Sequence, residues 1–475
     1  MTAVTADRTY EAIMQRQGEI LRKAAGIDYD HFRRGRLVVD YEGLMAHPGY
    51  SLEQIAEIQA QCKVGKTPML ELRNLTRLAR HFAAPGMGAR IFVKDEAANA
   101  SGSFKARRAS LSVFHSTRSG YPGVIAATSG NYGAAVAAMA AMRGQRCIVV
   151  QEVHDSRGLG QPEIIEKGRA CEAYGAEVWQ TTVGPELFYI HLLLLEETGY
   201  FNASLYTPFS VAGIQTLGHE VGAEITALTG SPPAAVVVTH AGGGNVTGTA
   251  LGLRAAGCAD TQVVAASVDL HGLNMASDRD FNRKSFTTGH TGFAMPFLKY
   301  PDRTDVPYNA ARPLRFLDRY VTVNQGAVFY ITQLLAELEG LERGPAGNTS
   351  LAAAFKLAQE MSADEVLVVQ ETEYTGAGKH PTAQLTFARE NGVRVIRGPA
   401  PANVPGETIA IPHGPADMVY EEMDLQRIRT SYLRGQLSRV GIESVRELTD
   451  DELEYLAAET NLPVEDCVRL LSGLN

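Results

Sequence analysis

Residues 92–108 read FVKDEAANASGSFKARR, a stretch that combines a strand, a polar loop and the start of a helix. The loop brings Phe104 and Lys105 to the beginning of the helical segment. A lysine that apolar neighbours shield from water has a lowered pKa and can attack a carbonyl as an amine nucleophile. Most lysines are ordinary surface residues, so the position of Lys105 alone supports either interpretation. Lys94 is less well placed, because it lies within the strand and not at its end.

This stretch begins a regular alternation of short apolar segments with Ala- and Leu-rich helical segments. Apolar strands separated by helices are typical of a parallel sheet that helices cover on both faces. We therefore predict an α/β fold in which ligands bind at the carboxyl ends of the strands. The predicted strands are 91–93, 123–127, 147–151, 177–182, 235–239, 262–268 and 365–370, and the predicted helices include 104–117, 132–143, 162–174 and 246–256.

A second turn with chemical potential lies at residues 126–133 (AATSGNYG), where a strand leads into a helix. Ser129 and Asn131 can cap that helix, and the free backbone N–H groups of its first turn can bind a carboxylate. Simple capping without any ligand is an equally good interpretation of such a turn.

The third turn, residues 240–248 (HAGGGNVTG), follows the strand AVVVT. Successive glycines let the backbone approach a phosphate closely, and the dipole of the following helix favours the negative charge. A dinucleotide-binding turn is the rival interpretation, but GGGN lacks the G-x-G-x-x-G spacing.

The fourth segment is LVVQETEYTGAGKH at residues 367–380. Thr375 or Thr372 can offer a hydroxyl to a heterocyclic nitrogen. Glu371 and Glu373 can bind a cation or lie on a solvated edge. Taken alone, this segment is an ordinary loop.

Together the four segments resemble the tryptophan-synthase-β-like (fold type II) family of pyridoxal-phosphate enzymes. The resemblance implies two parallel-sheet α/β domains with the cofactor in the cleft between them, plus helical N- and C-terminal extensions. It implies pyridoxal 5'-phosphate as the cofactor, with Lys105, in a G-S-F-K context, as the catalytic lysine that forms an aldimine with it.

The resemblance also implies a role for each of the other turns. The substrate carboxylate is expected at Thr128, Ser129 and Tyr132, and the cofactor hydroxyl at Asn131. The cofactor phosphate is expected at Gly242, Gly243, Gly244 and Asn245. Thr375 is expected at the pyridine nitrogen, with Thr372 or a glutamate as the alternative.

The domain boundaries that we expect follow this family pattern. A helical N-terminal extension covers residues 1–60, with Ser51 capping a helix, and a helical C-terminal extension covers 416–475, where Thr449 and Glu452 form a capping box. The large cofactor-binding α/β domain comprises residues 61–105 and 211–415, and the smaller α/β domain comprises residues 106–210.

Over nearly its full length the chain further resembles the large (β) subunits of 2-amino-4-oxopentanoate thiolases. The segments that carry this resemblance include GIDYDHF at 26–32, QEVHDSRGLGQPEIIEK at 151–167 and SFTTGHTGF at 285–293. The resemblance implies cleavage of 2-amino-4-oxopentanoate with coenzyme A to acetyl-CoA and alanine. It also implies a homo-oligomer that works with a separate small subunit.

Other functions stay open at this stage. Another pyridoxal-phosphate reaction at the β- or γ-carbon of an amino acid, such as elimination, deamination or C–C bond formation, is the main alternative. A regulatory or scaffold protein that keeps the fold without turnover is disfavoured by the intact Lys105 and the complete turns. A nicotinamide-dependent dehydrogenase is disfavoured by the glycine spacing.

Residues 270–320 interrupt the strand–helix alternation, and an insertion of this size is more often functional than not. It contains Thr287, Thr288 and His290, which we expect to stabilise an oxyanion on the substrate ketone, although His290 can equally be a loop residue without a role. For coenzyme A the candidate cations are Arg107, Arg108 and Arg157.

Composition sets the remaining limits. The 475 residues carry a formal net charge of −9, which argues against a general nucleic-acid binder. No apolar stretch approaches the ~20 residues of a membrane-spanning helix, no secretory signal is visible, and no motif for a metal site is found. The five cysteines form no CxxC pair, so we expect reduced, buried thiols in a cytoplasmic protein.

Overall fold

The structure, a computed structural model, describes residues 7–128, 130–184, 186–271, 280–285, 294–302, 305–374 and 381–473. Its largest sheet has seven strands in the order β1-β2-β10-β7-β8-β9-β13. The five central strands run parallel, whereas the edge strands β1 and β13 are antiparallel to their neighbours. The strands are β1 (Met69–Glu71), β2 (Arg90–Asp95), β7 (Ala235–Thr239), β8 (Gln262–Val268), β9 (Arg319–Val323), β10 (Val366–Glu371) and β13 (Glu421–Glu422).

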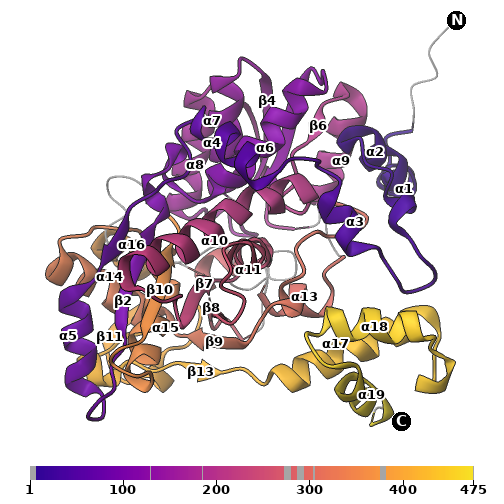
Figure 1. The fold of residues 1–475 in the computed structure, drawn as a ribbon. Helices are drawn as coiled ribbons and strands as arrows, with labels where there is room; N and C mark the ends of the chain where they lie inside the picture. The colour runs from indigo at the N-terminus through magenta and orange to yellow at the C-terminus, as the bar shows by residue number, and fades with distance from the viewer. Residues whose placement is uncertain are drawn as a thin grey trace, which may run out of the picture.

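A second sheet of four parallel strands, in the order β5-β4-β3-β6, lies above the first in Figure 1. Its strands are β3 (Gly123–Thr128), β4 (Arg146–His154), β5 (Glu177–Thr182) and β6 (Phe201–Asn202). A separate parallel pair consists of β11 (Arg394–Arg397) and β12 (Thr408–Ile411).

Helices surround both sheets. Those of the N-terminal region are α1 (Tyr10–Gln15), α2 (Gln17–Ala25), α3 (Tyr41–Ala46), α4 (Leu52–Ala60) and α5 (Arg73–Phe82). The middle of the chain contributes α6 (Lys105–Arg118), α7 (Asn131–Met142), α8 (Pro162–Ala173), α9 (Glu186–Thr198), α10 (Pro208–Thr229), α11 (Gly244–Ala255), α12 (Phe281–Lys284) and α13 (Ala294–Lys299). The later helices are α14 (Gln325–Glu339), α15 (Thr349–Leu357), α16 (Pro381–Glu390), α17 (Leu425–Val440), α18 (Asp450–Glu459) and α19 (Val464–Ser472).

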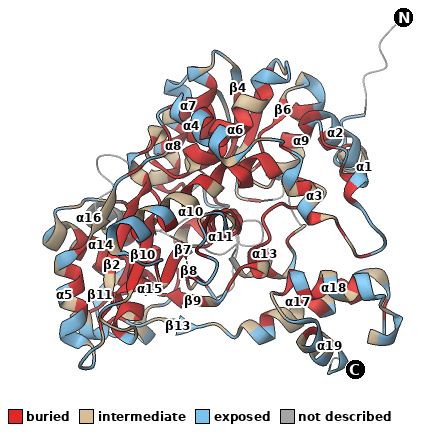
Figure 2. Cartoon of the chain, viewed as in Figure 1, coloured by how far each residue is buried: buried red, intermediate tan, exposed pale blue. Residues whose placement is uncertain are grey.

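Side chains of the central strands alternate between two buried faces, as the period of two in a strand requires. In β7, Val236 and Val238 pack on the side of α10 and α11, whereas Val237 packs on the side of α14 and α15. In the small sheet, Val124 belongs to the core that includes α7, and Ile125 to the core that includes α9. Figure 2 shows the resulting buried centre of each sheet in red.

All of the predicted strands and the predicted helices of the central region are present, as β2, β3, β4, β5, β7, β8, β10, α6, α7, α8 and α11. The alternation did not predict α10, a 22-residue helix that runs between the two sheets (Figure 1). Its residues are apolar or small on most sides, so it lacks the one-sided pattern by which a surface helix is recognised.

The terminal extensions are helical, as predicted. Ser51 caps α4 with a complete capping box, and Thr449 with Glu452 caps α18 in the same way. Ile428 and Tyr432 of α17 pack into the core on the α10 side of the large sheet. β13 of the large sheet falls within the expected C-terminal extension, and the domain boundaries stay a prediction.

All five cysteines are buried, and none takes part in a disulfide. Within the described ranges, no helix combines the length and apolar character of a membrane span. In the same part of the chain, no group of three or more His, Cys, Asp or Glu residues is placed to hold a metal ion.

Candidate active site

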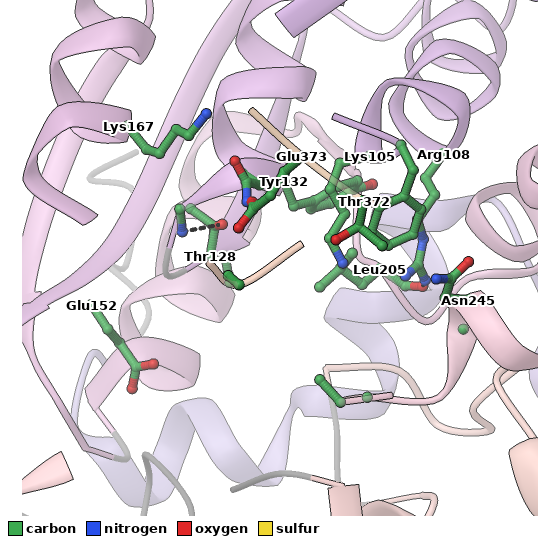
Figure 3. A pocket seen from close by; sticks show the side chains of 18 of the residues that line it. Lys105, Arg108, Thr128, Tyr132, Glu152, Lys167, Leu205, Asn245, Thr372 and Glu373 are labelled. Carbon is green, nitrogen blue, oxygen red and sulfur yellow. Dashed lines mark hydrogen bonds between the residues drawn. The ribbon is translucent and has the colours of Figure 1, made fainter. Parts of the chain in front are cut away.

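A cavity of about 160 Å³ opens where the carboxyl ends of strands from both sheets meet (Figure 3). Its walls come from the predicted turns and from segments far apart in the sequence. They include Phe104, Lys105, Arg108, Thr128, Asn131, Tyr132, Glu152, Lys167, Tyr206, Thr239, Gly242, Gly243, Gly244, Asn245, Asp305, Thr372 and Glu373. The structure therefore brings three of the predicted turns, and the strand end before the fourth, to one place.

Lys105 is the first residue of α6, and its side chain lines the cavity. Its Nζ lies 4.4 Å from the centroid of the Phe104 ring. Burial lowers the pKa of Lys105 to about 7; the nearby charge of Arg108 acts in the same direction, and Glu373 opposes it. A large share of the amine is thus uncharged at neutral pH, which is the nucleophilic form.

The glycine turn precedes α11, and each of its three glycines has a neighbour that leaves no room for a side chain. A Cβ on Gly242 would lie 2.5 Å from Tyr206 Oη, and one on Gly243 would lie 2.5 Å from the Pro313 ring. Gly243 also has φ +87°, which disfavours other residues. The first turn of α11 is therefore bare backbone that faces the cavity.

Two polar side chains at this turn lack partners within the described part of the chain. Both polar atoms of the Asn245 side chain are buried without a hydrogen bond, and so is the Thr239 hydroxyl. Buried polar groups are almost always paired, so an unpaired set around a helix N-terminus indicates a ligand with hydrogen-bonding atoms.

The turn that contains Ser129, Gly130 and Asn131, called the SGN turn below, leads into α7. Thr128 Oγ1 accepts hydrogen bonds from the N–H groups of Gly130 at 2.9 Å and Gly133 at 3.1 Å, so Thr128 caps the helix. The Thr128 hydroxyl proton and the buried, unpaired Asn131 Oδ1 remain available to a ligand in the cavity. Ser129 lies outside the described residues.

Only some of the residues at the end of β10 line the cavity. Thr372 and Glu373 line it, and the Thr372 carbonyl accepts a hydrogen bond from the Phe104 N–H at 3.0 Å. Glu371 is fully buried beside Gly347 and is not among the lining residues; burial raises its pKa well above the usual value. Thr375, expected at the pyridine nitrogen, lies outside the described residues.

A family model of pyridoxal-phosphate-dependent enzymes matches residues 61–372, well over half of the chain. The chain belongs to this family. The predicted membership in the pyridoxal-phosphate-dependent enzymes and the predicted fold type II class are confirmed.

Two relatives match almost end to end. One, from an unknown prokaryotic organism, is named 2-amino-4-ketopentanoate thiolase beta subunit and is 62% identical over 98% of each chain. Another with the same name, from Acetoanaerobium sticklandii, is 58% identical over 97% of this chain and 98% of its own. Among solved structures, an O-ureido-L-serine synthase variant with bound O-ureido-L-serine matches with a TM-score of 0.52 at 20% identity, covering 70% of this chain and 93% of its own. That likeness supports the fold only.

The residues of the cavity fit the cofactor of a pyridoxal-phosphate-dependent enzyme. The bare glycine turn and the unpaired Asn245 suit a phosphate, and the largely uncharged Lys105 suits an aldehyde. Asn131, with its unpaired oxygen, suits a hydroxyl group. Roles for individual residues remain proposals.

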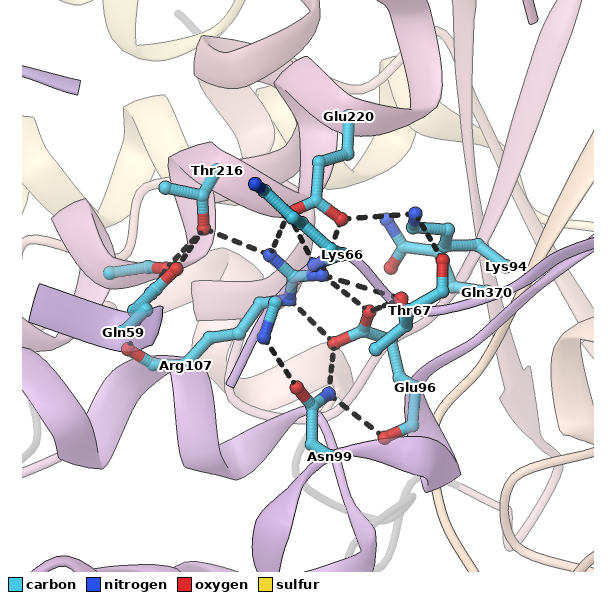
Figure 4. Close-up of polar contacts among 12 residues, drawn as sticks. Gln59, Lys66, Thr67, Lys94, Glu96, Asn99, Arg107, Thr216, Glu220 and Gln370 are labelled. Atoms are coloured by element: carbon cyan, nitrogen blue, oxygen red, sulfur yellow. Dashed lines mark hydrogen bonds and ion pairs between the residues drawn. The ribbon is translucent and has the colours of Figure 1, made fainter. Parts of the chain in front are cut away.

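Two of the candidate cations for coenzyme A already have partners within the protein, and their role stays a prediction. Arg107 is fully buried and forms paired hydrogen bonds with Glu96 and Glu220 (Figure 4). Arg157 forms ion pairs with Asp155 and Asp280. Arg108 alone among the three lines the cavity. Thr287, Thr288 and His290 lie outside the described residues.

Sequence reasoning missed four charged residues of the cavity, Glu152, Glu163, Lys167 and Asp305. Glu152 lies in β4 where a bulge separates it from His154, and bulges often redirect side chains next to active sites. It is 3% exposed, accepts a hydrogen bond from the Gly184 N–H at 3.2 Å, and has a pKa that burial raises to about 8. The sequence signal that could have identified Glu152 is its position directly after the predicted strand 147–151.

Proposed function

We propose that this chain is the large subunit of a thiolase that cleaves 2-amino-4-oxopentanoate with coenzyme A, yielding acetyl-CoA and alanine. The observation that carries the proposal is the near-full-length identity of 62% and 58% with two thiolase beta subunits. The name of those relatives also supports a separate small subunit as partner. Homo-oligomerisation and a cytoplasmic location stay predictions.

The net reaction sets the demands on the site. The thiol sulfur bonds to C4 of the substrate, the C3–C4 bond breaks with its electron pair left on C3, and C3 gains a proton. When bound, the cofactor supplies a conjugated system that takes up negative charge from the substrate carbons next to the amine. The protein must hold both molecules and move protons.

Lys105 is the residue that we assign to the cofactor aldehyde. With the cofactor held on the substrate amine, the amine of Lys105 would remain close to the reacting carbons. Because its pKa lies near 7, this amine can accept a proton from Cα at neutral pH.

Glu152 is the residue that we assign to proton donation on the other side of the cavity. Figure 3 shows it well separated from Lys105. A carboxyl group with a pKa near 8 is mostly protonated at pH 7, so it can donate a hydrogen bond or a proton to the C4 oxygen. This position suits the ketone end of a substrate whose amine lies at Lys105.

The decisive experiment mixes the purified chain, its small partner subunit, pyridoxal phosphate, coenzyme A and 2-amino-4-oxopentanoate, and follows the products by mass spectrometry. We expect acetyl-CoA and alanine in equal amounts, and neither from Lys105→Ala. Lys23→Ala, which removes an exposed lysine on α2, is the matched control and retains activity. Release of ammonia from serine, threonine or diaminopropionate without coenzyme A, in place of thioester formation, would contradict the proposal in favour of an eliminase.

A further inference from the structure

Two buried cations line the cavity without a carboxylate partner among the described residues. Arg108 is 3% exposed and Lys167 is 6% exposed. A buried charge that has no counter-ion costs several kcal/mol, so proteins seldom keep one without a use. In Figure 3 the two side chains lie on opposite sides of the cavity.

Arg108 lies against the glycine turn. A Cβ on Gly244, the first residue of α11, would lie 2.4 Å from Arg108 Nη2 and 2.8 Å from Nη1. The guanidinium donates to Ser210 Oγ at 2.8 Å and to the Leu205 carbonyl, and both acceptors are neutral. Burial lowers the pKa of Arg108 to about 10, which leaves it charged at neutral pH.

Lys167 lies against the SGN turn. It comes from α8, and its Cγ and Cβ lie 3.6 and 3.8 Å from the position of a Cβ on Gly130, the residue before α7. The only hydrogen bond of its ammonium group within the described residues is a long one of 3.5 Å to the Tyr374 carbonyl. The charge of Lys167 is therefore almost entirely available to the cavity.

We propose that each turn has its own buried counter-cation, with Arg108 binding the cofactor phosphate at the glycine turn and Lys167 binding the substrate carboxylate at the SGN turn. Among the described residues, the side chain of Asn245 at the first turn and the side-chain oxygen of Asn131 at the second have no hydrogen-bond partner, which independently supports a ligand at each turn. The Arg108 assignment rests on the family cofactor, and the Lys167 assignment on the proposed amino-acid substrate.

The two side-chain types match the two anions. A guanidinium offers several donors in one plane and suits the oxygens of a phosphate dianion, whereas an ammonium is a point charge that suits a monovalent carboxylate. The separation of the two cations places the phosphate and the carboxylate at different ends of one cavity. An amino acid can thus enter with its carboxylate steered away from the phosphate position.

The test compares pairs of ligands that differ by one anionic group. Apoenzyme is titrated with pyridoxal phosphate and with pyridoxal, and holoenzyme is titrated with alanine and with ethylamine, each followed by absorbance of the lysine-bound cofactor. We expect Arg108→Gln to lower the preference for pyridoxal phosphate over pyridoxal about 10- to 100-fold. Lys167→Gln should lower the preference for alanine over ethylamine by about 10-fold or more.

Each variant is the control for the other. Arg108→Gln should leave the preference for alanine within about twofold, and Lys167→Gln should do the same for the preference for pyridoxal phosphate, since charge–ligand contacts at separate sites are close to additive. Retained pyridoxal binding shows that a variant is folded, and Arg108→Lys and Lys167→Arg should recover part of each preference.

Two results would overturn the proposal. One is an unchanged preference in the matching variant, and the other is an equal loss of both preferences in either variant. A wild-type enzyme that does not prefer alanine to ethylamine contradicts the Lys167 assignment. Because none of these measurements uses coenzyme A, they stand whether or not thiolytic cleavage is confirmed.

Discussion

Two pairs of basic residues around α6 have opposite environments. Lys94 and Arg107 lie in an ionic cluster, where Arg107 is held by Glu96 and Glu220 and Lys94 by Glu220 and Glu224 (Figure 4). Lys105 and Arg108 line the cavity, and neither forms an ion pair within the described residues (Figure 3).

The comparison separates basic residues that form ion pairs within the protein from basic residues that form none within the described residues and can bind a ligand. In the ionic cluster, burial by itself would raise the pKa of Glu220, but the hydrogen bonds and charge of Arg107 lower it to about 2. In the cavity, burial outweighs the opposing charges and lowers the pKa values of Lys105 and Arg108. Groups with strongly shifted pKa values are enriched at functional sites, so Lys105 and Arg108 are candidates to bind a ligand.

The largest effect is expected when the ionic cluster is broken. Arg107→Met leaves Glu96, which is fully buried, without its cation. We expect a loss of about 3–5 kcal/mol in the free energy of unfolding, measured by urea denaturation of the apoenzyme. Arg108→Met removes an unpaired charge of similar burial and should leave the stability of the apoenzyme unchanged or raised. A smaller loss of unfolding free energy for Arg107→Met than for Arg108→Met would contradict this division between the two arginines.

Glu152 extends the comparison to a carboxyl group without a cation. Its pKa is raised from 4.5 to about 8, so the folded state keeps a proton that the unfolded chain releases above about pH 4.5. Stability contributed by this group is present at low pH and is lost as the pH rises to 8. Glu152→Gln should therefore gain stability relative to wild type between pH 5 and 8, by a few kcal/mol, since one pKa unit is worth about 1.4 kcal/mol.

The measurement is a series of urea denaturation curves of the apoenzyme across this pH range. Glu390→Gln, at an exposed position of α16, serves as the control and should run parallel to wild type. A constant difference between Glu152→Gln and wild type at every pH would show that Glu152 ionises normally.

A smaller effect concerns the rate at which Lys105 captures the cofactor. Only the uncharged amine attacks the aldehyde, and the pKa of Lys105 is near 7. The rate constant for reconstitution of apoenzyme should rise about tenfold between pH 5 and 6 and level off above pH 7. Stopped-flow absorbance measures it. A rate that continues to rise up to pH 10 would mean that Lys105 has the pKa of an ordinary lysine.

The alternation of strands and helices predicted most of the buried strands and the edge where the cavity lies, because burial on both faces leaves a clear pattern of apolar runs, but it did not predict β9 of the large sheet. The turns were found because glycine runs and capping residues directly after a strand are recognisable in a sequence, although each turn alone also allowed an interpretation without a ligand. The division between Arg107 and Arg108 was not predictable from neighbouring positions in one helix. It depends on Glu96 and on Glu220 of α10, the helix that shows no one-sided apolar pattern. Glu152 and Lys167 were missed because their importance depends on having no ion-pair partner among the described residues, which a sequence does not show.

The central claim is that Lys105, and not another buried lysine, carries the cofactor. Reduction of the holoenzyme with borohydride fixes the cofactor to its lysine, and peptide mass spectrometry then locates the modification. We expect modification of Lys105, with Lys94 unmodified because Glu220 and Glu224 hold it in the ionic cluster. Modification of Lys94 or Lys167, with Lys105 free, would contradict the assignment of Lys105.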